Sequence, residues 1–188
     1  MADGSRLVGG APLGVLTLPN AITFARLCTV PLVVWLVMRR DLGAAFWLFL
    51  AAGASDAIDG WLARRGRAST VGAVLDPMTD KALLVSIYVS LAAIGVLPAW
   101  IAILVVFRDL LIVGGVLLLT VAGQPVAIRP LFVSRVNTAL QIALAAVSLL
   151  FAAIGVPVRP ILVPLLWLVA ASTLGSGAAY VRLAARPR

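Results

Sequence analysis

The chain has 188 residues, of which 63% are hydrophobic and only 12% are charged, and its mean hydropathy is +1.13. A water-soluble domain cannot bury so much apolar surface, so this composition predicts a membrane protein of one domain. The absence of His and the single Cys, Cys28, exclude Ser-His-Asp triads, disulfides and ordinary zinc sites.

Six apolar stretches are long enough to cross a bilayer, which takes about 20 residues in a helix. Charged residues or Pro and Gly separate them. We therefore predict an all-α integral membrane fold with six transmembrane helices. A single domain would cover residues 1–188, with residues 1–17 as an N-terminal cytoplasmic segment. The predicted spans are residues 22–38, 43–62, 74–97, 100–121, 132–154 and 161–183.

The segment before the first span contains helix-start signals. Asn20 is predicted to cap the first helix, with Pro19 just outside it. A short interfacial helix is expected at this point. Residues 1–17 lack a charged stretch followed by an apolar one, so we expect no cleaved signal peptide.

The net charge of +8 is due to Arg rather than Lys, since Lys81 is the one Lys. In a membrane protein such charge is typical of loops near anionic headgroups, and we expect no nucleic-acid binding. Ten Arg lie on one side of the predicted spans and three on the other. The positive-inside rule therefore predicts that both termini and the loop containing Arg64 are cytoplasmic.

All seven acidic residues are Asp, and four of them lie within 25 residues of sequence. Asp56 and Asp59 are three residues apart, and Asp76 and Asp80 are four apart, so each pair shares a helix face. The connection between the two predicted helices is short. We therefore expect antiparallel neighbours whose acidic faces meet.

Four neighbouring carboxylates near a membrane repel one another and require cations. Oxygen ligands alone favour Mg²⁺ or Mn²⁺, with Ca²⁺ as a further option, and carboxylates from two helices favour a two-metal site. Gly60, Ala63 and Gly72 leave room for a nucleotide or diphosphate, and Arg64 and Thr70 could complete a phosphate cradle. Helix packing is the structural alternative for the small residues, and helix capping for the Asp residues.

The pattern Asp-x2-Asp-Gly-x2-Ala-Arg, then Gly-x3-Asp-x3-Asp, resembles the signature of the CDP-alcohol phosphatidyltransferase family, with every fixed position present. The resemblance implies a six-helix fold, often dimeric, with metal ligands and a CDP site. An acceptor oxygen would attack the lipid-side phosphorus of the diphosphate, and CMP would leave. The roles implied are metal binding for Asp56, Asp59, Asp76 and Asp80, general base for Asp80, and contact with the CDP-lipid for Asp56, Asp59, Gly60, Ala63, Arg64, Thr70 and Gly72.

Other segments resemble particular branches of this family. Residues 18–26 are similar to a stretch common to the phosphatidylglycerophosphate and cardiolipin synthase branches. Residues 76–91, the pair Arg108 and Asp109, and residues 128–141 resemble the mitochondrial-type cardiolipin synthases. That branch usually has Lys where this chain has Arg129 and Arg135, which keeps the charge but changes how phosphate is bound.

These segments also provide candidates for the acceptor site. Arg108, Arg129 and Arg135 could hold the phosphate of an anionic acceptor, with Asn137 and Gln141 completing the site. The alternative for Arg129 and Arg135 is that they are ordinary positive charges on the cytoplasmic side of the membrane. Arg108 lies deep in an apolar stretch, where a charge needs a partner, and Asp109 is the candidate.

The resemblance implies a cardiolipin synthase that uses CDP-diacylglycerol and phosphatidylglycerol. Phosphatidylglycerophosphate synthase, with glycerol 3-phosphate as acceptor, is the enzymatic alternative. A divalent-cation transporter and a purely structural membrane protein are the non-enzymatic ones. We expect contact with membrane lipids, a homodimer, and a bacterial plasma membrane location with the site facing the cytoplasm. The mitochondrial inner membrane is the alternative location.

Overall fold

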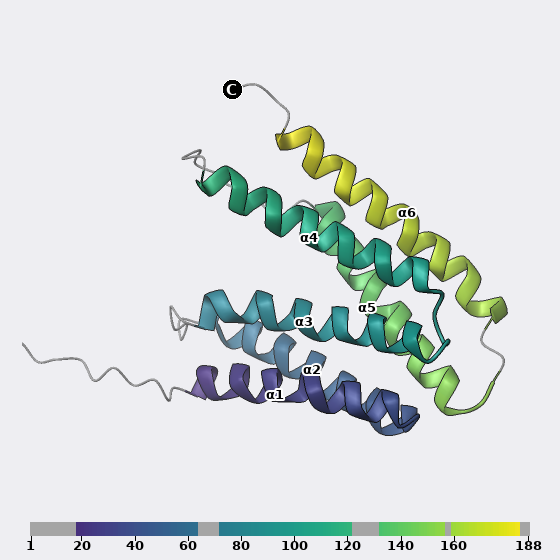
Figure 1. Cartoon of the computed structure of the whole chain (residues 1–188). Helices are drawn as coiled ribbons and strands as arrows, with labels where there is room; N and C mark the ends of the chain where they lie inside the picture. Colours follow the sequence, from purple (N-terminus) through teal and green to yellow (C-terminus); the bar gives the residue numbers. More distant parts are fainter. Residues whose placement is uncertain (1–17, 64–71, 122–131, 157–158, 185–188) are drawn as a thin grey trace, which may run out of the picture.

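The computed structural model describes the backbone of residues 18–63, 72–121, 132–156 and 159–184. Side chains are described for residues 27–55, 81–115, 132–156, 160–180 and 182. The described residues form six helices and no strand, as the sequence predicts (Figure 1). The helices are α1 (Leu18–Met38), α2 (Leu42–Ala63), α3 (Gly72–Ala93), α4 (Ala99–Val121), α5 (Phe132–Ala153) and α6 (Arg159–Ala184).

Successive helices run in opposite directions, so the chain passes back and forth along the bundle (Figure 1). Helix α1 packs against α2 and α3, and α4 packs against α3 and α6. Helix α5 joins these groups, because it contacts α2, α3 and α6. The carboxyl end of α2 and the amino end of α3 lie at the same end of the bundle, on the left of Figure 1.

The amino end of α1 differs from the sequence prediction. Asn20 was expected to cap the helix from outside, but α1 already begins at Leu18, so both Pro19 and Asn20 are helical. Pro is compatible with the first helical turn because the N–H groups there have no partner within the helix. Residues 18–20 continue directly into α1, and a short interfacial helix before them would fall on residues 1–17, which lie outside the described residues.

Glycine residues end two of the helices earlier than hydropathy alone predicts. Gly95 follows α3 with a φ of 79°, and Gly155 follows α5 with a φ of 68°. The N–H of Val96 then donates to the carbonyl of Leu91 at 2.9 Å. This is a Schellman motif, and it ends α3 at Ala93 although the apolar stretch continues to residue 97.

The bundle has a continuous apolar core. Fully buried side chains come from α1, α3, α4, α5 and α6, and they include Val33, Ile87, Tyr88, Leu91, Ile101, Leu144, Leu149 and Val169. Close packing of these side chains fixes how the helices lie against one another.

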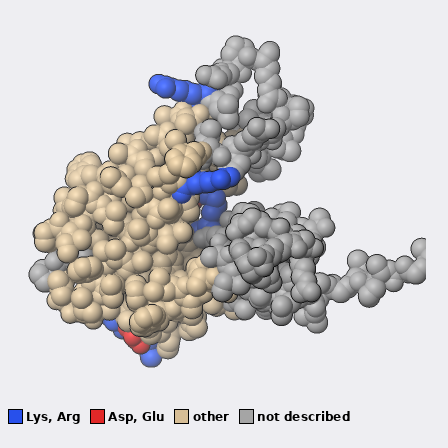
Figure 2. Space-filling model, turned by 180° about the vertical axis from the view of Figure 1, so that it is seen from behind, with Lys and Arg blue, Asp and Glu red and all other residues tan. Residues whose placement is uncertain are grey.

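The outside of the bundle is also apolar. Trp47, Phe132 and Trp167 are between 66% and 79% exposed. Figure 2 shows a broad surface without Lys, Arg, Asp or Glu, with blue side chains beside the grey residues and a small patch of blue and red side chains at the lower edge. A surface of this kind is expected where lipid surrounds a protein.

Two helical segments are long and apolar enough to cross a bilayer, among the residues that the structure describes. They are Phe132–Ala153 and Pro160–Tyr180. Shorter apolar segments are found at Leu27–Met38, Leu42–Ser55 and Lys81–Ala93. Six helices are thus confirmed, and the crossing of the membrane by all six stays a prediction.

Candidate active site

The four predicted metal ligands lie near two adjacent helix ends. Asp56 and Asp59 are in the last two turns of α2, and Asp76 and Asp80 are in the first three turns of α3. These ends lie at the same end of the bundle (Figure 1). The backbone therefore places all four residues toward the same end of the bundle. Their side chains lie outside the described set.

The donor set fits hard divalent cations. Four carboxylates supply oxygen ligands alone, which Mg²⁺ and Mn²⁺ prefer. Asp56 and Asp59 are separated by three positions within one helix, so both can face one ion-binding region. No group of three or more His, Cys, Asp or Glu occurs among the described side chains, which do not include these four Asp.

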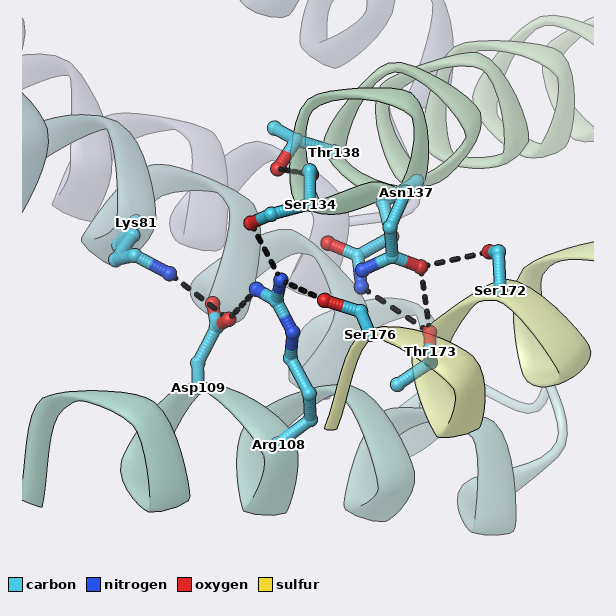
Figure 3. Close-up of polar contacts among 10 residues, drawn as sticks. Lys81, Arg108, Asp109, Ser134, Asn137, Thr138, Ser172, Thr173 and Ser176 are labelled. Atoms are coloured by element: carbon cyan, nitrogen blue, oxygen red, sulfur yellow. Dashed lines mark hydrogen bonds and ion pairs between the residues drawn. The ribbon is translucent and has the colours of Figure 1, made fainter. Parts of the chain in front are cut away.

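A buried ion pair lies within α4 and contacts the middle of α3 through Lys81. The Nη1 atom of Arg108 is 2.6 Å from Oδ1 of Asp109, and the Nζ atom of Lys81 is 2.8 Å from the same oxygen (Figure 3). Arg108 and Asp109 are only 4% and 6% exposed. Charges inside an apolar bundle are costly unless they are paired, and the sequence-based pairing of Arg108 with Asp109 is confirmed.

The same Arg108 side chain connects α4 to two further helices. Its Nη2 atom donates to the hydroxyl of Ser134 in α5 at 2.7 Å and to the hydroxyl of Ser176 in α6 at 2.6 Å. Its buried Nε has no partner among the described residues. Arg108 therefore fixes the relative positions of α4, α5 and α6.

A second polar cluster lies between α5 and α6. Oδ1 of Asn137 accepts hydrogen bonds from the hydroxyls of Ser172 at 2.7 Å and Thr173 at 2.8 Å (Figure 3). The side-chain amide of Gln141 lies 3.5 Å from the Thr173 hydroxyl. Hydrogen bonds of this kind stabilise the packing of helices within a membrane.

The predicted acceptor residues differ in accessibility. Arg135 is exposed, whereas Arg108, Asn137 and Gln141 are buried. Direct contact with an acceptor stays a prediction for all of them. Arg129 lies outside the described residues, as do Arg64 and Thr70 from the predicted CDP-lipid site. The backbone of Gly60, Ala63 and Gly72 is helical, but the surroundings of these three residues are outside the described set as well.

Several members of these networks were not singled out from the sequence. Lys81, Ser134 and Ser176 contact the ion pair, and Ser172 and Thr173 contact Asn137. The sequence did indicate a role for Lys81, since it directly follows Asp80 and is the one cation in α3. The hydroxyls of α6 gave no such signal, because Ser and Thr are common where transmembrane helices pack.

Comparison with known protein families decides the classification. The sequence profile of CDP-alcohol phosphatidyltransferases matches residues 16–174, which is most of the chain. The chain belongs to this family. The match includes α2 and α3 and most of the Arg108 network, namely Lys81, Arg108, Asp109 and Ser134, and it ends before Ser176.

Several curated relatives from the family are similar to this chain. A cardiolipin synthase (CMP-forming)/mitochondrial hydrolase fusion protein of Schizosaccharomyces pombe is 34% identical over 88% of this chain and 31% of its own length. The cardiolipin synthase (CMP-forming) of Homo sapiens is 30% identical over 71% of this chain and 50% of its own length. A chloroplastic CDP-diacylglycerol–glycerol-3-phosphate 3-phosphatidyltransferase of Oryza sativa is 32% identical over 95% of this chain and 60% of its own length. The chain thus spans less than two thirds of each of these relatives.

Proposed function

We propose that this phosphatidyltransferase is a cardiolipin synthase, which forms cardiolipin and CMP from CDP-diacylglycerol and phosphatidylglycerol. The observation that carries the proposal is the similarity to CMP-forming cardiolipin synthases from both fungi and animals, over 71% to 88% of this chain. The exposed cation Arg135 supports an anionic acceptor, and phosphatidylglycerol is one, as is glycerol 3-phosphate.

In the proposed reaction, a free glycerol hydroxyl of phosphatidylglycerol attacks the lipid-side phosphorus of the CDP-diacylglycerol diphosphate. Asp80 accepts the hydroxyl proton as general base. The bond between that phosphorus and the bridging oxygen breaks, and CMP leaves with the bonding electron pair. One phosphodiester is formed and one diphosphate bond is broken, so no redox partner is required.

Asp56, Asp59, Asp76 and Asp80 are proposed to hold two divalent cations, Mg²⁺ or Mn²⁺. When bound, these cations would neutralise the negative charge of the diphosphate. Gly60, Ala63 and Gly72 would leave space for the cytidine nucleotide, and Arg64 and Thr70 would contact its phosphates.

Arg135 is proposed to contact the acceptor directly, because its side chain is exposed. Arg129 is the second proposed cation of this site. For Arg108, Asn137 and Gln141 the contacts support a different role in the same site. They hold α5 against α4 and α6 and so position Arg135.

The proposed setting is a plasma membrane crossed by all six helices, with the Asp residues toward the cytoplasm and the chain in a homodimer. The exposed apolar side chains and the concentration of Arg near one end support this orientation. The orientation can be tested in sealed bacterial vesicles by measuring which Arg residues react with a membrane-impermeant reagent.

Phosphatidylglycerophosphate synthase is the second candidate, and the rice relative favours it, since that similarity extends over 95% of this chain. The deciding experiment incubates purified protein with labelled CDP-diacylglycerol and either phosphatidylglycerol or glycerol 3-phosphate. We expect CMP release and labelled cardiolipin with phosphatidylglycerol. Turnover of glycerol 3-phosphate alone would refute the proposal, and a transporter or a structural protein would release no CMP with either acceptor.

A further inference from the structure

The described part of the ion cluster of α3 and α4 contains two cations, Lys81 and Arg108, and one carboxylate, Asp109. Lys81 and Arg108 both contact the carboxylate of Asp109, at 2.8 Å and 2.6 Å respectively. Arg108 also donates hydrogen bonds to the neutral hydroxyls of Ser134 and Ser176. Among the described side chains, two cations therefore share one carboxylate.

The two cations differ in their access to an anionic ligand. Arg108 is 4% exposed and both of its Nη atoms are bonded within the protein. The side chain of Lys81 is 39% exposed, and its ammonium group has three protons, of which the contact with Asp109 uses one. Lys81 is thus the cation of this cluster that can donate to a bound molecule.

The position of Lys81 along α3 places it at the level of Asp80, the proposed general base. The two residues are consecutive, so they differ by a rise of about 1.5 Å and a rotation of about 100° about the helix axis. On α5, the exposed Arg135 directly follows Ser134, the residue that accepts a hydrogen bond from Arg108. The network therefore brings Lys81 and the segment bearing Arg135 to the same level of the bundle (Figure 3).

We propose that Lys81 binds the phosphate of the acceptor lipid and that Asp109, itself held by Arg108, positions the Lys81 ammonium. The inference rests on the proposed function and adds a residue to its acceptor site. Lys is a point charge with three donors and suits a tetrahedral phosphodiester. Because Asp109 already restrains the flexible side chain, less conformational entropy is lost when the phosphate binds.

The test measures steady-state kinetics of the full-length protein with the variants Lys81→Gln and Lys81→Arg. Loss of a charge-assisted hydrogen bond should raise the KM for phosphatidylglycerol about 10- to 100-fold in Lys81→Gln. The KM for CDP-diacylglycerol should change by less than about threefold, and Lys81→Arg should recover most of the acceptor affinity, because it keeps the charge. In the absence of CDP-diacylglycerol, the equilibrium affinity for short-chain phosphatidylglycerol should decrease in the same order, from the wild type to Lys81→Arg to Lys81→Gln.

Arg182→Gln is the matched control, because it removes an exposed cation from the last turn of α6 without touching the network. Its two KM values should stay at the wild-type level. An equal rise of both KM values in Lys81→Gln, or an unchanged acceptor KM, would overturn the assignment of Lys81 while leaving the proposed function intact. If the wild-type protein releases no CMP with any acceptor, the proposed function and this assignment both fail.

Discussion

The hydroxyl of Tyr88 in α3 donates a hydrogen bond of 3.0 Å to the backbone carbonyl of Gln141 in α5. Tyr88 is fully buried, and its ring is part of the core between these helices. A carbonyl inside a helix already accepts from its own helix, and its second lone pair remains free for such a bond. The contact links α3, which contains Asp76 and Asp80 in its first three turns, to α5, which contains the proposed acceptor residue Arg135.

Tyr88→Phe is expected to lower the free energy of unfolding by about 0.5 to 1.5 kcal/mol, since the ring keeps its packing and only the hydrogen bond is lost. Tyr88→Ala should lower it by about 3 to 5 kcal/mol, because it also leaves a cavity. Thermal unfolding of the purified protein in detergent measures both. Equal destabilisation by the two variants would show that the hydroxyl, and not the ring, dominates.

The ion pair of α4 leads to a prediction about partner removal. Asp109→Leu leaves Arg108 buried without its counter-charge, so the variant should lose about 3 to 5 kcal/mol of stability. Replacing both residues, as Arg108→Met with Asp109→Leu, should be less destabilising than Asp109→Leu alone. The unfolding free energies of the single and double variants form a double-mutant cycle that measures the coupling. A double variant as unstable as the sum of the singles would contradict the pairing.

Sequence reasoning located this pair because two charges inside an apolar stretch need partners, and the nearest opposite charge to Arg108 was its neighbour Asp109. It could not identify Ser134 and Ser176 as the other partners. Their contacts depend on the rotation of α5 and α6 about their axes, which packing of the whole bundle determines. Asn137 and Gln141 were among the predicted acceptor residues, but their partners Ser172 and Thr173 escaped notice for the same reason.

Helix positions were predicted well where hydropathy changes sharply. The fourth predicted span, residues 100–121, differs by one residue from α4. Errors occurred where local backbone chemistry decides the boundary, at Gly95, whose left-handed conformation ends α3, and at Asn20, which lies inside α1. Hydropathy averages over many residues and cannot detect such single-residue effects.

A third prediction concerns the acidic residues. Asp59→Asn removes a proposed metal ligand without a change in size, and CMP release should fall by at least about 100-fold. Binding of Mn²⁺, followed by its electron paramagnetic resonance signal, should weaken in parallel. Asp41→Asn is the control: Asp41 precedes α2, its Oδ1 accepts from the N–H of Ala44 at 3.2 Å, and Asn caps helices equally well. Intact activity in Asp59→Asn would favour a structural role for the cluster.

The last prediction separates two glycines by backbone conformation. A Cβ built on Gly95 or on Gly53 meets no atom within 4 Å, so steric clash does not distinguish the two. Gly95 has a φ of 79°, a conformation that Ala adopts only at a cost of about 1 to 2 kcal/mol. Gly53 lies inside α2, where Ala is the better helix former by about 0.5 to 1 kcal/mol. Gly95→Ala should therefore lower the thermal unfolding midpoint and Gly53→Ala should raise it, and shifts of the same sign would disprove the role of Gly95 in ending α3.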